Sequence, residues 1–138
     1  MIVQTFLPYQ SFEQSLACLD NRRLGKQRVE AMQILNALRA GSVSRWRGHP
    51  AVRMWDGWES LLEIYHDLAI KAWVDRGFRN NMRLVSKSFW LRDPISKPPW
   101  LTKEFCASHR SNLLRKDPVY YSQFGWKELP NLPYIWPC

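Results

Sequence analysis

The spacing of apolar and polar residues predicts two helices in the first part of the chain. Residues 11–14 read Ser-Phe-Glu-Gln, the pattern of a capping box, and predict a short helix to about Leu19. Asp20 can cap a longer helix that ends before Gly41. Gly25 weakens this helix by ~1 kcal/mol relative to alanine, so we expect another group to approach closely there. A row of apolar residues at helical spacing should face the core: Leu24, Ala31, Leu35 and Leu38.

A further long helix is predicted between Pro50 and Gly77, because proline suits a first helical position and glycine a helix end. His66 lies beside its apolar stripe and should be structural. The stripe comprises Met54, Trp58, Leu61, Leu62, Tyr65, Leu68, Ala69, Ala72 and Trp73. The opposite face should be solvated and carries Asp56, Glu59, Glu63 and Asp67. We therefore expect this helix to serve as scaffold.

The second half of the chain alternates irregular and helical segments. Residues 78–101 lose the helical period and contain three prolines, which predicts an irregular basic connection with a short helical turn near 83–87. Thr102 can cap a helix to about Lys116, and Asp117-Pro118 should end it. The tail over residues 129–138 contains three more prolines and should lie extended against the body.

These patterns favour an all-α fold, since no alternating strand pattern of useful length occurs. The 138 residues fit one compact domain, 1–138, with about three to five helices, long loops and an extended tail rich in proline and aromatic residues. A composition of 46% hydrophobic, 14% aromatic and 23% charged residues excludes disordered, collagen-like and coiled-coil chains. Neither a membrane span of ~20 apolar residues nor a secretory signal is visible, so we expect a cytoplasmic protein. Cys18, Cys106 and Cys138 show no disulfide or metal-binding spacing, and the first two should be buried thiols.

Net charge is the first indication of function. The chain has 20 Lys and Arg residues against 12 Asp and Glu residues, a formal net charge of +8. Residues 50–77 hold five acids and only three bases, whereas residues 76–103 hold seven bases and one acid. A basic surface with one acidic side suits a polyanion, most simply nucleic acid. Charge that serves only solubility would give the same composition.

One carboxylate lies among the cations of the second predicted helix. Arg23, Lys26, Gln27 and Glu30 share one face by the i, i+3, i+4, i+7 rule, and Arg22 precedes them. In a cleft that binds DNA, Glu30 would repel phosphate. Its presence there therefore indicates a chemical role, as a general acid–base or as a stabiliser of a developing cation. The same spacing also suits an ordinary helical ion pair between Lys26 and Glu30, worth ~0.2–0.5 kcal/mol.

Basic residues followed by aromatic residues in the stretch 108–126 form a second candidate site. Cations can hold phosphates while rings stack on exposed bases, although aromatic side chains also commonly close a core. His49 suits either a phosphate contact or packing at a helix start. The expected DNA contacts are Arg22, Arg23, Arg45, Arg47, His49, His109, Arg110, Arg115, Lys116, Tyr120 and Tyr121. No metal site is expected, and the chain has no nucleotide-binding loop or serine nucleophile elbow.

Three stretches carry a family resemblance. Residues 5–8, Thr-Phe-Leu-Pro, look like a threonine-initiated N-terminus, and residues 24–30, Leu-Gly-Lys-Gln-Arg-Val-Glu, look like a helix with a catalytic glutamate. Residues 108–126 look like a C-terminal aromatic segment used in DNA and lesion recognition. Together they resemble the pyrimidine-dimer DNA glycosylase family, of the phage endonuclease V type. The resemblance implies a small, basic, all-α monomer that acts on double-stranded DNA without a cofactor.

The same resemblance implies a mechanism in which the α-amine of an N-terminal threonine attacks C1′ of the sugar. The base leaves, and the resulting imine opens the strand by β-elimination. Glu30 is the matched carboxylate. Thr5 does not directly follow the initiator methionine, however, and the bulky Ile2 disfavours removal of Met1. The amine is therefore open between Met1, Thr5 and Lys26, and Glu30 can alternatively activate water.

Our leading hypothesis is a DNA glycosylase, with or without AP lyase activity, that acts on damaged or modified pyrimidines in duplex DNA. We expect it in the cytoplasm with the nucleoid. The main alternative is a non-catalytic nucleic-acid-binding protein on the same scaffold, whose affinity would fall steeply with salt. A second alternative is an adaptor for an acidic protein partner, which would show no preference for nucleic acid over other polyanions.

Overall fold

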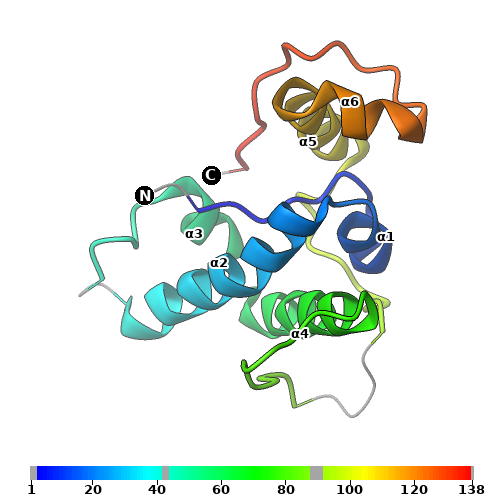
Figure 1. Ribbon diagram of the computed structural model, residues 1–138. Coiled ribbons are helices and arrows are strands. Elements are labelled where there is room, and N and C mark those ends of the chain that lie inside the picture. Colours follow the sequence, from blue (N-terminus) through cyan, green and yellow to red (C-terminus); the bar gives the residue numbers. More distant parts are fainter. Residues whose placement is uncertain (1–2, 42–43, 88–91, 138) are drawn as a thin grey trace.

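The computed structural model describes residues 3–41, 44–87 and 92–137 and is helical, with no strand in those ranges. The expectation of an all-α fold is thus confirmed. Figure 1 shows the arrangement: α2 crosses the middle of the molecule, α4 lies beside it, and α5 with α6 lies on the other side of the first segment of the chain. The elements are α1 (Phe12–Ala17), α2 (Asn21–Ala40), α3 (Pro50–Trp55), α4 (Glu59–Asp75), α5 (Lys103–Lys116), α6 (Pro118–Tyr121) and the 3-10 turn η2 (Ser122–Phe124).

Helix ends in the described chain follow the capping residues that the sequence indicates. Ser11 accepts from the backbone N–H of Gln14 at the start of α1, and Asp20 accepts from that of Arg23 at the start of α2. Thr102 does the same at the start of α5, which ends at Lys116 as predicted. Each of these side chains satisfies a donor that the helix itself leaves free, so these boundaries are fixed locally.

The single helix expected between Pro50 and Gly77 is wrong, because the chain breaks it into α3 and α4. The break lies at Asp56 and Gly57, where Gly57 adopts φ +87°, a backbone conformation that a side chain disfavours. Trp55 is fully buried immediately before the break. The six α-helices of the described residues therefore exceed the three to five expected, and α3 is free to take its own direction (Figure 1).

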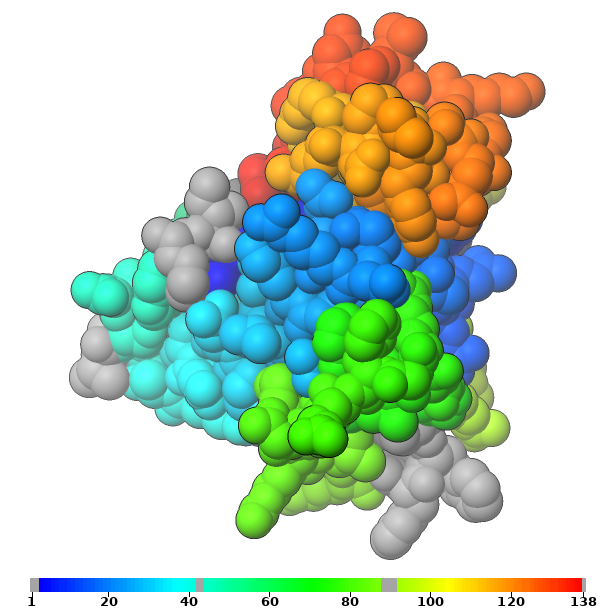
Figure 2. Space-filling model, viewed as in Figure 1, coloured from blue at the N-terminus to red at the C-terminus, as the bar shows by residue number. Residues whose placement is uncertain are grey.

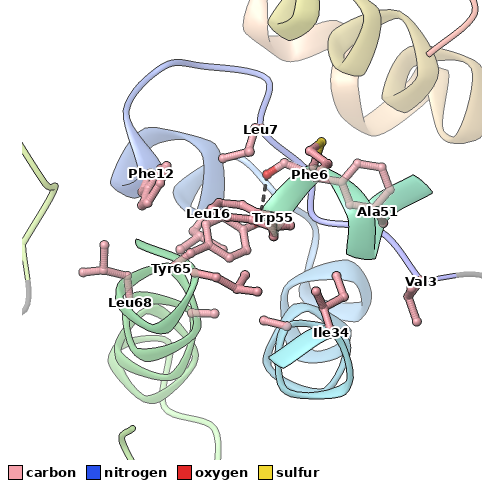
Figure 3. Close-up of a cluster of buried hydrophobic side chains, with 14 of the residues drawn as sticks. Val3, Phe6, Leu7, Phe12, Leu16, Ile34, Ala51, Trp55, Tyr65 and Leu68 are labelled. Atoms are coloured by element: carbon pink, nitrogen blue, oxygen red, sulfur yellow. Dashed lines mark hydrogen bonds between the residues drawn. The ribbon is translucent and has the colours of Figure 1, made fainter. Parts of the chain in front are cut away.

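The core lies mainly between α2 and α4, the two helices with the most extensive mutual contact in the described chain. The first segment of the chain, residues 3–11, precedes α1. Figure 3 shows that its residues Val3, Phe6 and Leu7 pack in the same cluster as Trp55 and Tyr65. The apolar row predicted on α2 is buried in full, with Leu24, Ala31 and Leu35 at 0% exposure and Leu38 at 8%. Burial of each of the three leucines contributes on the order of 1.5–3 kcal/mol, so this packing holds α2 in place.

Gly25 has the close neighbour that its position in a helix predicted. A Cβ atom added at Gly25 would lie 3.0 Å from Cη2 and Cζ3 of Trp73 on α4. The Trp73 ring stacks on Phe78 on one side and carries the Arg28 guanidinium 4.6 Å from its centroid. Glycine therefore allows α2 and α4 to approach each other at this crossing.

Asp67 corrects the expectation of a fully solvated acidic face on α4. Its side chain is buried and accepts hydrogen bonds from the backbone N–H groups of Val85 (2.9 Å) and Ser86 (2.8 Å), and it lies 2.8 Å from His66 Nδ1. His66 is buried too, in line with the structural role expected of it. The helical turn predicted at residues 83–87 is absent, because Asp67 holds this segment in a non-helical conformation.

The C-terminal tail follows α5 back toward the start of the chain (Figure 1). Ser111 and Asn112 of α5 bind the tail backbone at Leu129 and Leu132, and Ser108 accepts from the backbone N–H of Ile135 (3.3 Å). In Figure 2, α2 lies between the surface of α5 and α6 and that of α4. The tail is therefore held along α5 through backbone hydrogen bonds.

Both described cysteines are buried, as expected. Burial raises the pKa of the Cys18 thiol to about 12 and that of the Cys106 thiol to about 11, so both stay protonated. Cys138 lies outside the described residues. None of the described helices is long and apolar enough to cross a membrane.

Candidate active site

A pocket of about 690 Å³ opens where five parts of the chain meet. These parts are the first described segment, the N-terminal half of α2, the start of α3, the end of α5 and the C-terminal tail. Its volume falls in the range of small-molecule sites, about 300–1,000 Å³. We call it the Glu30 pocket; its lining residues are Val3, Gln4, Phe6, Arg22, Arg23, Lys26, Glu30, His49, Pro50, Lys116, Tyr134 and Trp136.

The Glu30 pocket has a cationic side and an aromatic side. Successive turns of α2 supply Arg22, Arg23 and Lys26, and α5 adds Lys116 from its last residue. The aromatic side is built from distant segments, with Phe6 from the start of the chain and two rings from the tail. Cations beside partly exposed rings of the tail suit a ligand that is both anionic and aromatic, which describes a nucleotide.

Glu30 is the acidic side chain of this pocket. It is partly buried, and burial raises the pKa of its carboxyl group. The charges of Lys26 and Lys116, together with hydrogen bonds from the Gln4 backbone and the Gln27 side chain, act in the opposite direction without cancelling the effect of burial. A carboxyl group with a raised pKa is suited to proton transfer near neutral pH.

Gln27 fixes the carboxylate relative to the start of the chain. Its fully buried amide donates from Nε2 to the Gln4 carbonyl (3.0 Å) and to Glu30 Oε2 (3.3 Å). Its Oε1 accepts from the backbone N–H of Phe6 (2.9 Å) and lies 2.6 Å from the Tyr65 hydroxyl. Because Nε2 faces two acceptors and Oε1 faces a backbone donor, only one amide orientation satisfies the contacts. Gln27 is a positioning residue for Glu30.

Lys116 is an exposed lysine that lines the pocket from the end of α5. Burial lowers the pKa of its ammonium group, and the neighbouring charges of Arg23 and Arg115 lower it further, while Glu30 acts in the opposite sense. The arginines remain charged at any relevant pH.

His49 lies at a helix start, one of the two positions considered for it. Its Nδ1 accepts from the backbone N–H of Ala51 (3.1 Å) and caps α3, and its ring also lines the Glu30 pocket. Burial lowers the pKa of the imidazole, which favours the neutral form. No group of three His, Cys, Asp or Glu side chains able to hold a metal occurs in residues 3–41, 44–87 and 92–137.

Six of the residues predicted for the site come together in this pocket: Arg22, Arg23, Lys26, Glu30, His49 and Lys116. Three others are corrected, because they have no exposed surface. Thr5 is buried with its hydroxyl accepting from Trp55 Nε1 (3.0 Å), and His109 is buried with Nδ1 accepting from the backbone N–H of Leu7 (3.0 Å). Tyr121 is buried with its hydroxyl donating to Asp20 (2.5 Å). Met1 lies outside the described residues.

The remaining predicted residues do not line the pocket, and several already have partners. Arg110 forms a bidentate pair with Glu128 (3.0 Å for both bonds) and donates to the Pro8 carbonyl (2.7 Å). Arg47 pairs with Asp56 at 2.8 Å, and the guanidinium of Arg45 lies over Trp46. The hydroxyl of Tyr120 donates to the Leu19 carbonyl (3.3 Å), and Arg115 donates to Asn112. Their positions leave them as flanking contacts at most.

Sequence reasoning missed the aromatic side of the pocket. Tyr134 and Trp136 lie two residues apart in an extended segment, a spacing that puts both side chains on the same side of the chain. Their rings lie 5.6 Å apart between centroids, and Tyr134 also contacts His109 at 5.2 Å. The spacing of Tyr134 and Trp136 can be read from the sequence, but the part of the protein that their rings face cannot.

Comparison with family models identifies one family, described as pyrimidine dimer DNA glycosylase, over residues 3–85. Comparison with curated proteins and with solved structures finds no match. The matched residues make up more than half of the chain. They include the first segment and α1 to α4, and therefore Gln27 and Glu30. The chain therefore belongs to the pyrimidine dimer DNA glycosylase family.

Proposed function

We propose that this protein is a DNA glycosylase that acts on damaged or modified pyrimidines in duplex DNA, with Glu30 as the catalytic carboxylate. The observation that carries the proposal is a partly buried glutamate with a raised pKa in a pocket otherwise lined by cations and rings. We further propose that it works as a monomer on double-stranded DNA in the cytoplasm.

The cations supply affinity for the phosphate backbone. Arg22 and Arg23 lie at the first turn of α2 on the rim of the pocket, next to Lys26. Each phosphate contact of this kind releases counterions and makes binding weaker at high salt. A carboxylate in the same place opposes phosphate binding, so Glu30 requires another explanation, and chemistry at the sugar provides one.

The pocket suits one nucleotide turned out of the duplex. An enzyme that acts on a base or on C1′ must extrude the nucleotide, and a lesion lowers the cost of doing so. Tyr134 and Trp136 offer partly exposed rings on which an extruded base can stack, which contributes about 1–3 kcal/mol per base. Stacking on one side would leave the sugar near Glu30 and the cations.

Glu30 would act at the moment the glycosidic bond breaks. The sugar gains positive charge at C1′ as the base departs, and an ionised carboxylate nearby stabilises that charge. The Gln27 amide holds the carboxylate in one orientation, so little reorganisation is needed during the reaction.

The test uses duplexes that carry ultraviolet-induced dimers or single modified pyrimidines. After incubation, alkali cleaves every base-free site and reports base release whether or not the protein itself cuts the strand. Glu30→Gln should lower the release rate by about 10²–10⁴-fold, the usual contribution of an acid–base group. DNA binding should be retained or tightened, because a negative charge has left a cationic pocket.

Glu104→Gln is the matched control, since Glu104 is an exposed carboxylate at the first turn of α5, away from the pocket. It should release base at the wild-type rate. If the wild-type protein binds duplex DNA but releases no base from any substrate of the panel, the protein is a binding module and the glycosylase proposal fails.

A further inference from the structure

His49 differs from the other two histidines in the surroundings of its ring nitrogens. His66 and His109 are buried, and the Nε2 atom of each is enclosed without a hydrogen-bond partner. Nε2 of His49, a half-buried residue, is not enclosed in this way and bonds to no residue of the described ranges. Since the His49 ring lines the Glu30 pocket, this nitrogen is open to a ligand there.

The other ring nitrogen fixes the tautomer of His49. Nδ1 accepts a hydrogen bond from the backbone N–H of Ala51 (3.1 Å). A backbone amide of this kind can only donate, so Nδ1 carries the lone pair and the proton of the neutral ring lies on Nε2. A second proton on the ring would set Nδ1–H against the Ala51 N–H. His49 therefore offers the pocket an uncharged N–H donor.

Pro50 holds the His49 ring at the start of α3. The residue before a proline is kept out of the helical region, and His49 is extended, with φ −67° and ψ 135°. Proline at the first position of α3 has no N–H, so the histidine caps the next one, that of Ala51. Local backbone geometry thus sets the direction of the Nε2 donor before any ligand binds.

The electrostatic surroundings of His49 also favour the neutral ring. Burial lowers the pKa of His49, and the positive charge at the N-terminus of the chain lowers it further. Lys26 and Lys116 influence the pKa of Glu30, whereas no lysine or arginine of the described chain has such an effect on His49. This difference indicates that the ring lies apart from the cations of the pocket.

A neutral donor suits a carbonyl oxygen better than a phosphate, for which the pocket already has the cations of α2 and α5. A pyrimidine base carries a carbonyl group at C2, next to the nitrogen that joins the base to the sugar. When the glycosidic bond breaks, its electron pair passes to that nitrogen and is delocalised onto O2. A hydrogen bond to O2 therefore becomes stronger in the transition state than in the bound substrate.

We propose that His49 is a catalytic residue whose Nε2–H donates a hydrogen bond to O2 of the departing pyrimidine. This inference rests on the proposed glycosylase function and adds a contact to the leaving group. The bond between C1′ and N1 breaks with both electrons going to the base. In hydrolysis, C1′ gains the oxygen of a water molecule and the base gains one of its protons. His49 keeps its proton throughout, and no oxidant or reductant is consumed.

Two substitutions separate the donor from the cap. In His49→Asn the amide oxygen can still accept from the Ala51 N–H, because asparagine is a favoured N-cap, but the Nε2 donor is lost. In His49→Gln the longer side chain can place an amide N–H near the former Nε2, but glutamine is not a preferred N-cap. Urea unfolding should therefore find His49→Asn the more stable of the two variants.

Base release should follow the opposite order. Single-turnover assays use whichever modified duplex the wild-type protein cleaves to a base-free site. We expect the rate to fall by about 10²–10³-fold in His49→Asn, the usual effect of losing one such donor, and to be about tenfold higher in His49→Gln than in His49→Asn. Thr102→Asn is the control, because it exchanges one N-cap for another at the start of α5, outside the pocket, and it should keep the wild-type rate.

A purely structural role of His49 predicts that stability and rate change together. Base release by His49→Asn at the wild-type rate, or a slower rate in His49→Gln than in His49→Asn, overturns the proposal. Nitrogen NMR of the imidazole gives a readout that does not depend on catalysis. It should show Nε2 protonated and Nδ1 unprotonated at neutral pH, and the opposite tautomer overturns the proposal as well.

The pH profile distinguishes a neutral donor from a charged acid. An imidazolium acid would lose its proton as the pH rises through ~6.5, whereas the neutral donor is unchanged from pH ~6 to ~8. A fall in wild-type rate over this range that is absent from His49→Asn would show that the charged ring acts, and would overturn the proposal. The other titratable side chains that line the pocket are Arg22, Arg23, Lys26 and Glu30 from α2, Lys116 from α5 and Tyr134 from the tail.

The outcomes also separate this inference from the glycosylase proposal. If the wild-type protein releases base and His49→Asn does so equally fast, only the role of His49 fails. If the wild-type protein binds duplex DNA and releases no base from any modified duplex, the glycosylase proposal fails and the role of His49 fails with it.

Discussion

Replacement of Gln27 by methionine should be among the most damaging single changes in the protein. Methionine has a similar length and helix propensity, so α2 itself should persist. The change removes the acceptor of the Phe6 N–H and the donor to the Gln4 carbonyl, and both residues are buried. A buried backbone group without a partner costs about 1–3 kcal/mol, so two of them should lower the free energy of unfolding by about 2–6 kcal/mol.

Such a loss is a large part of the 5–15 kcal/mol by which a domain of this size is usually stable. Urea unfolding followed by tryptophan fluorescence measures it directly. Gln14→Met is the matched control, because Gln14 lies exposed on α1, and it should change stability by less than about 0.5 kcal/mol. If Gln27→Met costs no more than this control, the Gln27 contacts do not anchor the first segment and the account of the pocket is wrong.

The same variant should also alter the chemistry of the site. The hydrogen bond from Gln27 lowers the pKa of Glu30, so its loss should raise that pKa further. Base release requires the ionised carboxylate in our proposal. The acidic limb of the rate profile should therefore move to higher pH in the folded variant, and an unmoved limb would show that Gln27 does not act on Glu30.

Two further predictions concern the scaffold. Burial lowers the pKa of His109 from 6.5 to about 3 in the folded protein, so as pH falls below 6.5 the unfolded chain takes up a proton that the folded chain refuses. The free energy of unfolding should therefore decrease by up to ~1.4 kcal/mol per pH unit as the pH falls from ~6.5 to ~5. The decrease should be smaller in His109→Asn. Equal pH slopes of the two proteins in thermal unfolding would contradict this. Gly25→Ala should stabilise a protein that already carries Trp73→Leu by ~1 kcal/mol, because alanine has the higher helix propensity. It should not stabilise the wild type, because the new Cβ atom is crowded against Trp73 at a cost of about 1–3 kcal/mol. Equal gains in urea unfolding in the two backgrounds would refute the close approach at Gly25.

Local structure was largely readable from the sequence because it depends on near neighbours. The caps at Ser11, Asp20 and Thr102 act within one helical turn, so the starts of α1, α2 and α5 were predicted correctly. The face of α2 that carries Lys26 and Glu30 follows from helix geometry alone. These predictions needed no knowledge of the partner elements.

The errors arose where a distant contact outweighed a local preference. The period of residues 50–77 suits one helix, but burial of Trp55 and the left-handed conformation of Gly57 divide it in two. Asp67 fits a solvated face by its spacing and is instead buried under the backbone of residues 85 and 86. His109 has the chemistry of a phosphate contact, yet the first segment and the tail close over it.

The sequence by itself determined the helical fold, the starts of three helices, the excess of positive charge and the pairing of a glutamate with cations on one face of α2. Only the tertiary structure decided that this face forms one side of a pocket, because its other sides come from the start of the chain, from α5 and from the tail. Side chains so far apart in sequence leave no periodic signal. Their meeting depends on how the helices pack, and packing depends on the whole core at once.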